Sequence, residues 1–256
     1  MRRSTTKSLL PALLLTLGSL PLLPSCADNN SSMFVVGVMK LDDTTCTVKA
    51  DGTAPILAGG VMDVAFTQSY RGFLLVGNQL TQRGSREQLR TETSRVALRG
   101  AEVQLTTLDG RLLGNYSTVG TGFVDASAGD VAAYGAMSVD IIPSALGGNQ
   151  ALLDAGAVVA KIRVFGDTLG NTAITSSELD FPIRVCKGCL VTYPTSAADP
   201  SQPAGGAYLC TRAATTDTTN EVVPCRPGQD QSFPCTACSA SLDLCRDPAQ
   251  NPSYGP

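Results

Sequence analysis

The chain has 256 residues, and its 19 Lys and Arg against 22 Asp and Glu give a formal net charge of −3. This balance offers no basic surface for nucleic acid, whose binding depends on Lys and Arg that neutralise phosphates, so we expect no nucleic-acid partner. The sequence contains no histidine and no tryptophan. The first absence excludes Ser-His-Asp and Cys-His nucleophiles and histidine-ligated metals, and the second disfavours a site that stacks sugars or bases.

The first 26 residues contain the three parts of an export signal. Arg2, Arg3 and Lys7 charge its start, and a short apolar stretch fills residues 9–23. A membrane-spanning helix needs about 20 unbroken apolar residues, whereas this stretch is shorter and is interrupted by proline and glycine. Residues 1–26 are therefore predicted to be a cleavable signal peptide rather than a permanent membrane span.

The signal ends in Leu23-Pro24-Ser25-Cys26, which resembles the lipobox of bacterial lipoproteins. The resemblance implies that Cys26 is the site of lipid attachment and that the mature protein is anchored to a membrane. Ordinary cleavage after Ala27 is the open alternative, because Ser25-Cys26-Ala27 also fits the small-x-small pattern of that peptidase. We expect the protein in the cell envelope, anchored to the outer membrane by its lipid, or otherwise periplasmic or secreted.

Residues 27–32 are polar and predict a tether that holds the body away from a bilayer. Residues 33–185 consist of short apolar runs rich in β-branched residues and separated by turn-forming residues, which is typical of strands. We expect an all-β domain with an immunoglobulin- or fibronectin-like β-sandwich fold. The predicted strands cover residues 34–40, 46–49, 61–67, 72–80, 95–99, 101–107, 112–119, 136–142, 158–165 and 178–185.

Asp42 and Asp43 lie between the first two predicted strands. Paired carboxylates can act in acid-base catalysis. Aspartate is also favoured in turns, where its side chain accepts hydrogen bonds from the nearby backbone. We interpret this pair as part of a turn.

Arg83, Arg86 and Arg90 are candidates for a weak anion-binding site. If they converge, they could bind an anionic glycan, a lipid headgroup or an acidic partner, because guanidinium matches carboxylate and phosphate in bidentate fashion. Glu87 and Glu92 lie among them, which favours a solvated surface whose charges pair with one another.

The chain reversals of the body have local signals. Leu108-Asp109-Gly110-Arg111 predicts a hairpin, because Asp-Gly lies between two apolar runs. Residues 167–171 are rich in turn formers and predict that the last two strands pair antiparallel. Pro182 predicts that the last strand lies at an edge or beside a bulge. Residues 143–155 are the one predicted helix, which Gly147 and Gly148 would each destabilise by about 1 kcal/mol relative to Ala.

Residues 186–247 form a cysteine-rich, loop-like module, and residues 248–256 are predicted to be a frayed end. Such a polar stretch needs covalent cross-links to offset its ordering entropy. Seven of its residues are cysteines, so complete intramolecular pairing requires Cys46 to bond with one of them. We expect its partner to be Cys186 or Cys189, which follow directly on the last strand. The disulfide candidates are Cys46, Cys186, Cys189, Cys210, Cys225, Cys235, Cys238 and Cys245.

Two C-x-x-C pairs, Cys186 with Cys189 and Cys235 with Cys238, allow several interpretations. Four thiolates could bind zinc, and a single pair could exchange disulfides if its first cysteine began a helix. Covalent haem attachment is excluded, because histidine does not follow either pair. Structural disulfides are favoured in an exported chain, so we expect no metal and no cofactor.

Two segments, residues 185–190 and Cys225-Arg226-Pro227-Gly228-Gln229-Asp230, are similar to cysteine-rich lipoproteins that recur in myxobacteria. The resemblance implies an envelope lipoprotein but no particular activity. We therefore predict a non-catalytic lipoprotein, without catalytic residues, that is a structural module or binds a protein or ligand. Its expected partners are the membrane, through the N-terminal lipid, and another envelope protein. The alternative is a thiol-active or metal-binding envelope protein that uses the C-x-x-C pairs.

Overall fold

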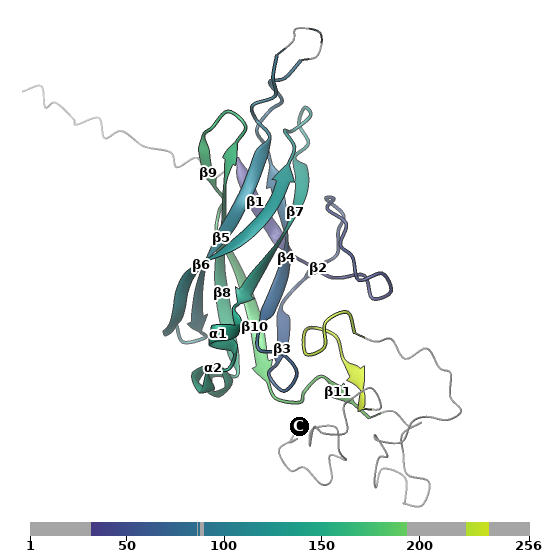
Figure 1. The fold of residues 1–256 in the computed structure, drawn as a ribbon, viewed down its shortest axis with the longest axis vertical. Helices are drawn as coiled ribbons and strands as arrows, with labels where there is room; N and C mark the ends of the chain where they lie inside the picture. The colour runs from purple at the N-terminus through teal and green to yellow at the C-terminus, as the bar shows by residue number, and fades with distance from the viewer. Residues whose placement is uncertain (1–31, 86, 88–89, 194–223, 236–256) are drawn as a thin grey trace, which may run out of the picture.

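The computed structural model describes residues 32–85, 87, 90–193 and 224–235. Two β-sheets make up its body (Figure 1). The first sheet has the order β2-β1-β4-β7, formed by Ile56–Leu57, Met33–Met39, Tyr70–Asn78 and Ala133–Ile142. The second has the order β3-β10-β8-β5-β6, formed by Gly60–Asp63, Leu179–Cys186, Ala157–Thr168, Val96–Thr107 and Leu112–Val124.

Five further elements are short. Strand β9, Ala173–Thr175, pairs with β8, and β11, Val191–Thr192, pairs in parallel with β12, Phe233–Pro234. The helices α1 and α2 comprise Ser144–Gly147 and Gln150–Ala155. Among the described residues, no helix is long and apolar enough to span a membrane. The all-β class predicted from the sequence is confirmed.

Both sheets contribute to one hydrophobic core. Its largest fully buried side chains include Leu74 on β4, Leu105 on β5 and Ile162 on β8. The edges of the sheets approach each other where β6 passes β7, and a Cβ atom on Gly135 would lie only 2.3 Å from the backbone oxygen of Phe123. Glycine at this point allows the close approach of the two backbones.

The last two long strands follow the predicted pattern. Val158, Ala160, Ile162 and Val164 of β8 are buried, and β8 pairs antiparallel with β10 as expected. The β5–β6 hairpin also forms at Asp109-Gly110, where Gly110 has a φ of 86°. Alternating burial and an Asp-Gly turn are strong signals because each has a direct physical cause.

Three predictions of local structure are wrong. Residues 46–49 form no strand, because Asp42 binds the backbone N–H groups of Thr44 and Thr45 and Cys46 has a left-handed φ of 56°. Residues 95–99 and 101–107 belong to one strand, β5, whose pairing with β6 and β8 shifts register between Leu98 and Gly100. A glycine inside a strand often marks such a bulge.

The third error concerns Pro182. Its strand, β10, is an interior strand between β3 and β8 without a register shift, rather than an edge strand or a strand beside a bulge. Pairing with β3 begins only at Ile183, one residue after the proline. The missing N–H of Pro182 is therefore accommodated just before the ladder with β3 begins.

The predicted helix of residues 143–155 is divided in two. Gly147 ends α1, and Asn149 begins α2 by accepting a hydrogen bond of 3.0 Å from the N–H of Ala151. Gly156, with a φ of 63°, ends α2 in the left-handed conformation that favours glycine. The two adjacent glycines thus fall at the break between helices.

Candidate functional site

The first C-x-x-C pair forms a tight turn at the end of β10, which we call the cysteine turn (residues 186–190). Cys186 is the last residue of β10, and Gly188 reverses the chain with a φ of 85°. A disulfide joins Cys186 to Cys189, and both residues are partly exposed. The two cysteines are only three positions apart in sequence, so their disulfide closes a very short loop. On the chain-entropy model it therefore stabilises the fold by only about 1.6 kcal/mol.

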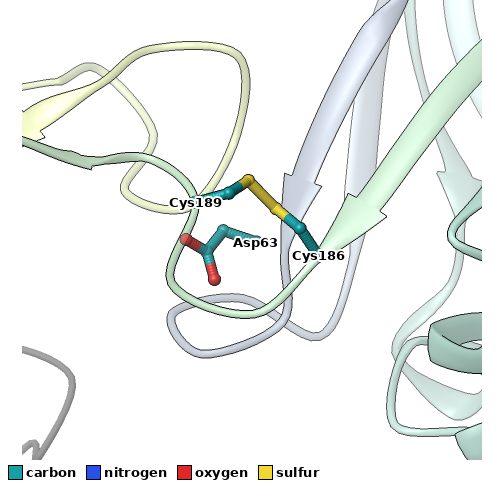
Figure 2. Close-up of side chains that lie close together, drawn as sticks. All are labelled: Asp63, Cys186 and Cys189. Atoms are coloured by element: carbon teal, nitrogen blue, oxygen red, sulfur yellow. A yellow bond between two sulfur atoms is a disulfide. The ribbon is translucent and has the colours of Figure 1, made fainter. Parts of the chain in front are cut away.

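Asp63 lies beside this disulfide and is completely buried (Figure 2). It is the last residue of β3 and pairs with Cys186 in the parallel ladder. Its Oδ1 accepts hydrogen bonds from the N–H groups of Gly188, at 2.6 Å, and Ala65, at 3.1 Å. Its Oδ2 accepts one from the N–H of Leu190 at 3.0 Å. The carboxylate therefore holds the cysteine turn against the end of β3.

Asp63, Cys186 and Cys189 bring three metal-ligating side chains together. One carboxylate oxygen and the two Sγ atoms all lie within 4.8 Å of one another. While the disulfide is closed, its sulfurs are neither thiolate nucleophiles nor metal ligands. In this oxidised state the cluster cross-links the turn, and reduction would release two thiols beside a fixed carboxylate.

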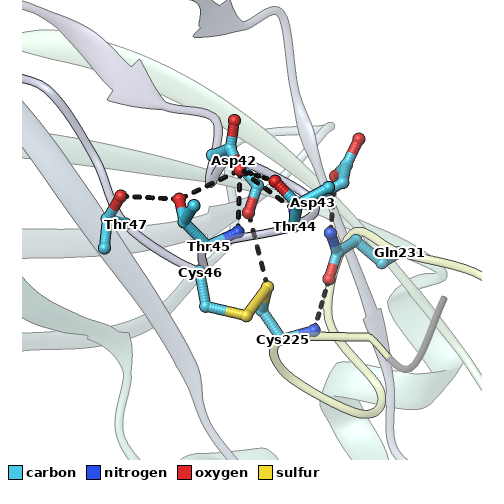
Figure 3. Close-up of a disulfide and its surroundings, with 8 residues drawn as sticks. All are labelled: Asp42, Asp43, Thr44, Thr45, Cys46, Thr47, Cys225 and Gln231. Carbon is cyan, nitrogen blue, oxygen red and sulfur yellow. Dashed lines mark hydrogen bonds between the residues drawn. A yellow bond between two sulfur atoms is a disulfide. The ribbon is translucent and has the colours of Figure 1, made fainter.

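A second disulfide joins Cys46 to Cys225, which are 179 residues apart in sequence (Figure 3). It attaches residues 224–235, which we call the cap segment, to the loop between β1 and β2. The Nε2 of Gln231 donates to Asp43 at 2.6 Å, and its Oε1 accepts from the N–H of Cys225 at 2.7 Å. The disulfide between Cys46 and Cys225 closes a long loop and therefore stabilises the fold by about 5 kcal/mol on the same chain-entropy model.

The turn predicted at Asp42 and Asp43 is confirmed. Oδ1 of Asp42 accepts hydrogen bonds from the backbone and hydroxyl groups of both Thr44 and Thr45, as Figure 3 shows. These bonds, the strongest from the Thr44 hydroxyl, hold the pKa of Asp42 well below its usual range. The Lys40 ammonium, 2.9 Å away, likewise lowers the pKa of Asp43. Both carboxylates are thus structural parts of the loop.

Partly buried polar contacts fasten the cap segment along β3 and β4. Asp230 accepts from the hydroxyl of Tyr70 at 2.8 and 3.0 Å and from the N–H of Val61 at 2.8 Å. The side-chain amide of Gln229 bonds to both backbone groups of Arg71, at 2.7 and 3.0 Å. Burial raises the pKa of Asp230 above its ordinary value and, together with the Asp230 charge, raises the pKa of Tyr70.

The cysteine prediction is confirmed in one respect and wrong in another. Cys46 does bond with a cysteine of the C-terminal module, but its partner is Cys225 rather than Cys186 or Cys189. The turn at Gly188 brings these last two cysteines to each other instead. Cys235 is buried and also disulfide-bonded. The other predicted positions Cys26, Cys210, Cys238 and Cys245 lie outside the described residues.

The three arginines of the predicted anion site are only partly covered by the described residues, which exclude Arg86. Arg83 and Arg90 are exposed. The N–H of Arg83 donates to Glu92 at 3.0 Å, and the backbone of Arg90 bonds to that of Ser85. These contacts order the loop backbone, and the anion site stays a prediction.

The sequence reasoning missed Asp63, Tyr70 and Asp230. Asp63 falls inside an apolar run that was assigned to a strand, and an acidic residue in such a run is a signal for a buried, hydrogen-bonded carboxylate. The partners of Asp230 lie on β3 and β4, 160 or more residues away, so local patterns could not reveal them.

The fold and the site define an all-β protein whose C-terminal cap segment is fastened to two sheets by a long-range disulfide and by the side chains of Gln229 and Asp230. No model of a known protein family matches the chain, and no curated protein matches it significantly in sequence.

Proposed function

We propose that the protein is a non-catalytic lipoprotein of the cell envelope, a structural or binding module displayed on the lipid of Cys26. The observation that carries this proposal is the use of its best-formed polar clusters. Asp63 holds the cysteine turn, and Asp230 and Gln229 hold the cap segment. These side chains hold parts of the fold together by hydrogen bonds, and the disulfides add covalent cross-links.

Asp230 is the strongest argument for catalysis among the described residues. A buried carboxyl with a raised pKa in a cleft is a typical general acid or base. Here, however, Asp230 accepts from Tyr70, Val61 and Gln229, and the hydroxyl of Tyr70 is itself fully buried. This arrangement favours a structural carboxylate, because both of its oxygens already accept hydrogen bonds from groups of the protein.

Location and architecture belong to the same proposal. Disulfides persist in oxidising compartments, which supports export, and the proposed anchor implies attachment to the outer membrane. Two sheets with mainly antiparallel pairing around one core support an immunoglobulin- or fibronectin-like sandwich. The proposed partner is another envelope protein.

The test is the mass of the mature N-terminus together with incorporation of a labelled fatty acid in a bacterial host. We expect a chain that begins at acylated Cys26, and we expect Cys26→Ala to lose the label. A mature chain that begins at Asp28 without lipid would contradict the anchor while leaving export intact. A chain that keeps residues 1–26 would contradict export itself.

Thiol exchange through the cysteine turn is the second candidate function. Its supporting observation is a partly exposed disulfide that contributes little to the fold, in contrast to the bond between Cys46 and Cys225. Mild dithiol treatment should then release two thiols from the turn before the fold is lost. Mass spectrometry after alkylation would identify them, and Cys186→Ser/Cys189→Ser is the control. If Cys186 and Cys189 stay bonded until the protein unfolds, this candidate is wrong.

A further inference from the structure

We infer that the reduced cysteine turn and Asp63 form a binding site for a zinc-like divalent cation. The ligands are the thiolates of Cys186 and Cys189 and one carboxylate oxygen of Asp63, with the fourth position open to solvent. Three protein ligands with an open position are the pattern of reactive rather than purely structural zinc sites. The site does not depend on the lipid anchor or on a partner protein.

The distances among the donors fit one ion after a small movement. In a tetrahedral site with Zn–S near 2.3 Å and Zn–O near 2.1 Å, neighbouring ligand atoms lie about 3.6–3.8 Å apart. All three donors already lie within 4.8 Å of one another. On reduction the sulfurs separate from their bonded distance, which a two-residue turn with Gly188 in the left-handed conformation permits.

Asp63 retains room for a metal ion. An ionised carboxylate has about four acceptor positions, and three are filled by the N–H groups of Gly188, Ala65 and Leu190. Among the described residues, Leu190 is the one donor to Oδ2, which leaves an acceptor position of this oxygen for the ion. The three N–H donors also fix the orientation of the carboxylate, which is the role that outer hydrogen bonds play for metal ligands.

The position of the cysteine turn gives a metal ion access to the sulfurs and allows the disulfide to be reduced without loss of the fold. Cys186 and Cys189 are partly exposed, which provides an entry path for the ion. Opening their disulfide forfeits only about 1.6 kcal/mol of chain entropy. The core between the two sheets does not include either cysteine, so it persists when the turn is reduced.

Formation of the site requires a dithiol reductant, which supplies the electrons and protons that open the disulfide. The disulfide takes two electrons and two protons from the dithiol, which becomes a disulfide, and Cys186 and Cys189 become thiols. Binding of the divalent cation then releases the two thiol protons to solvent. The site is consequently absent in the oxidised protein and present in the reduced protein, so metal binding reports the redox state of the turn.

Cobalt(II) titration of the purified mature protein tests this inference, because thiolate-to-cobalt absorption reports sulfur ligation directly. The protein is reduced with a phosphine, which does not compete for metal, and is kept without oxygen. Reduced Cys186→Ser/Cys189→Ser keeps every other cysteine and gives the background. We expect one more equivalent of bound cobalt in the wild type than in this variant, displaced by zinc, and no excess in the oxidised wild type. Equal cobalt binding by the two reduced proteins would overturn the site.

Asp63→Asn tests the carboxylate, because it retains one acceptor oxygen for the turn but loses the charge. We expect the thiolate absorption to remain and the affinity to fall at least tenfold, and an unchanged affinity would overturn the role of Asp63. X-ray absorption of the zinc-loaded reduced wild type provides a reading that does not depend on the variant's folding. Two sulfurs with oxygen ligands support the site, whereas four sulfurs contradict it.

Discussion

Replacing the two long-range cysteines, in Cys46→Ser/Cys225→Ser, should cause a large loss of stability. Their bond spans 179 residues, so in the chain-entropy model it lowers the entropy of the unfolded chain by an amount equivalent to about 5 kcal/mol. The bond within the cysteine turn spans three residues and is worth about 1.6 kcal/mol in the same model. The matched control is therefore Cys186→Ser/Cys189→Ser, which also removes one disulfide by replacing two cysteines with serine.

The assay is thermal unfolding of the oxidised proteins, followed by calorimetry. For a chain of this size, 1 kcal/mol corresponds to roughly 2–4 °C in Tm. We expect a decrease of about 10–20 °C without the Cys46–Cys225 bond and of about 3–6 °C without the Cys186–Cys189 bond. Limited proteolysis should also cut the cap segment faster in the first variant, because its covalent attachment to the β1–β2 loop is lost.

Equal decreases in Tm for the two variants would refute the reasoning from loop length. A larger decrease in the cysteine-turn variant would mean that this turn, with Asp63 beneath it, carries more of the stability than its loop entropy provides. A negligible decrease for Cys46→Ser/Cys225→Ser would mean that the unfolded chain is already compact enough to keep these residues close.

Three further perturbations test the hydrogen bonds of Asp230 and the close backbone packing at Gly147. Tyr70→Phe should destabilise the protein by about 1–3 kcal/mol in urea unfolding, because it removes a donor from the partly buried Asp230 carboxylate, and an unchanged midpoint would contradict this. Burial raises the pKa of Asp230 in the folded state above 3.8, so the wild type should gain stability relative to Asp230→Asn as pH falls through the raised pKa toward 3.8. Urea unfolding at several pH values checks this sign, and a constant difference would refute it. Gly147→Ala should cost about 1–3 kcal/mol, since its Cβ would lie 1.7 Å from the backbone oxygen of Gln68, whereas Gly148→Ala has nothing within 4 Å and should be neutral or slightly stabilising by thermal melting.

The sequence predicted the elements whose signal is local. Strand β8 alternates Ala160, Ile162 and Val164 with Lys161 and Arg163, and this period of two specifies one buried and one solvated face without knowledge of the partner strand. The hairpin at Asp109-Gly110 is equally local. Strands β2, β9, β11 and β12 have two or three residues each, which is too short for any periodicity to appear.

The same reasoning failed where long-range contacts or side-chain hydrogen bonds decide the conformation. Residues 46–49 include β-branched residues that favour a strand. However, the Asp42 side chain accepts hydrogen bonds from the backbone N–H groups of Thr44 and Thr45, just before them, and so stabilises a turn. Cysteine parity correctly required a partner for Cys46 in the C-terminal module, because parity is a global count. Choosing Cys225 among seven requires the position of the cap segment, which Asp230 fixes through Tyr70 and Val61.

Asp63 connects the two sites that sequence patterns leave separate. Its carboxylate holds the cysteine turn, while its own N–H donates to the carbonyl of Gly228 in the cap segment at 2.8 Å. Gly228 has a φ of 83°, and a Cβ there would lie 3.0 Å from the Asp63 carbonyl oxygen, so glycine allows the cap backbone to pack closely against Asp63. A cation bound to the reduced turn would pull on the carboxylate of this same residue. Proteolytic sensitivity of the cap segment should therefore differ between the reduced metal-free and reduced zinc-loaded protein, and Asp63→Asn should reduce that difference.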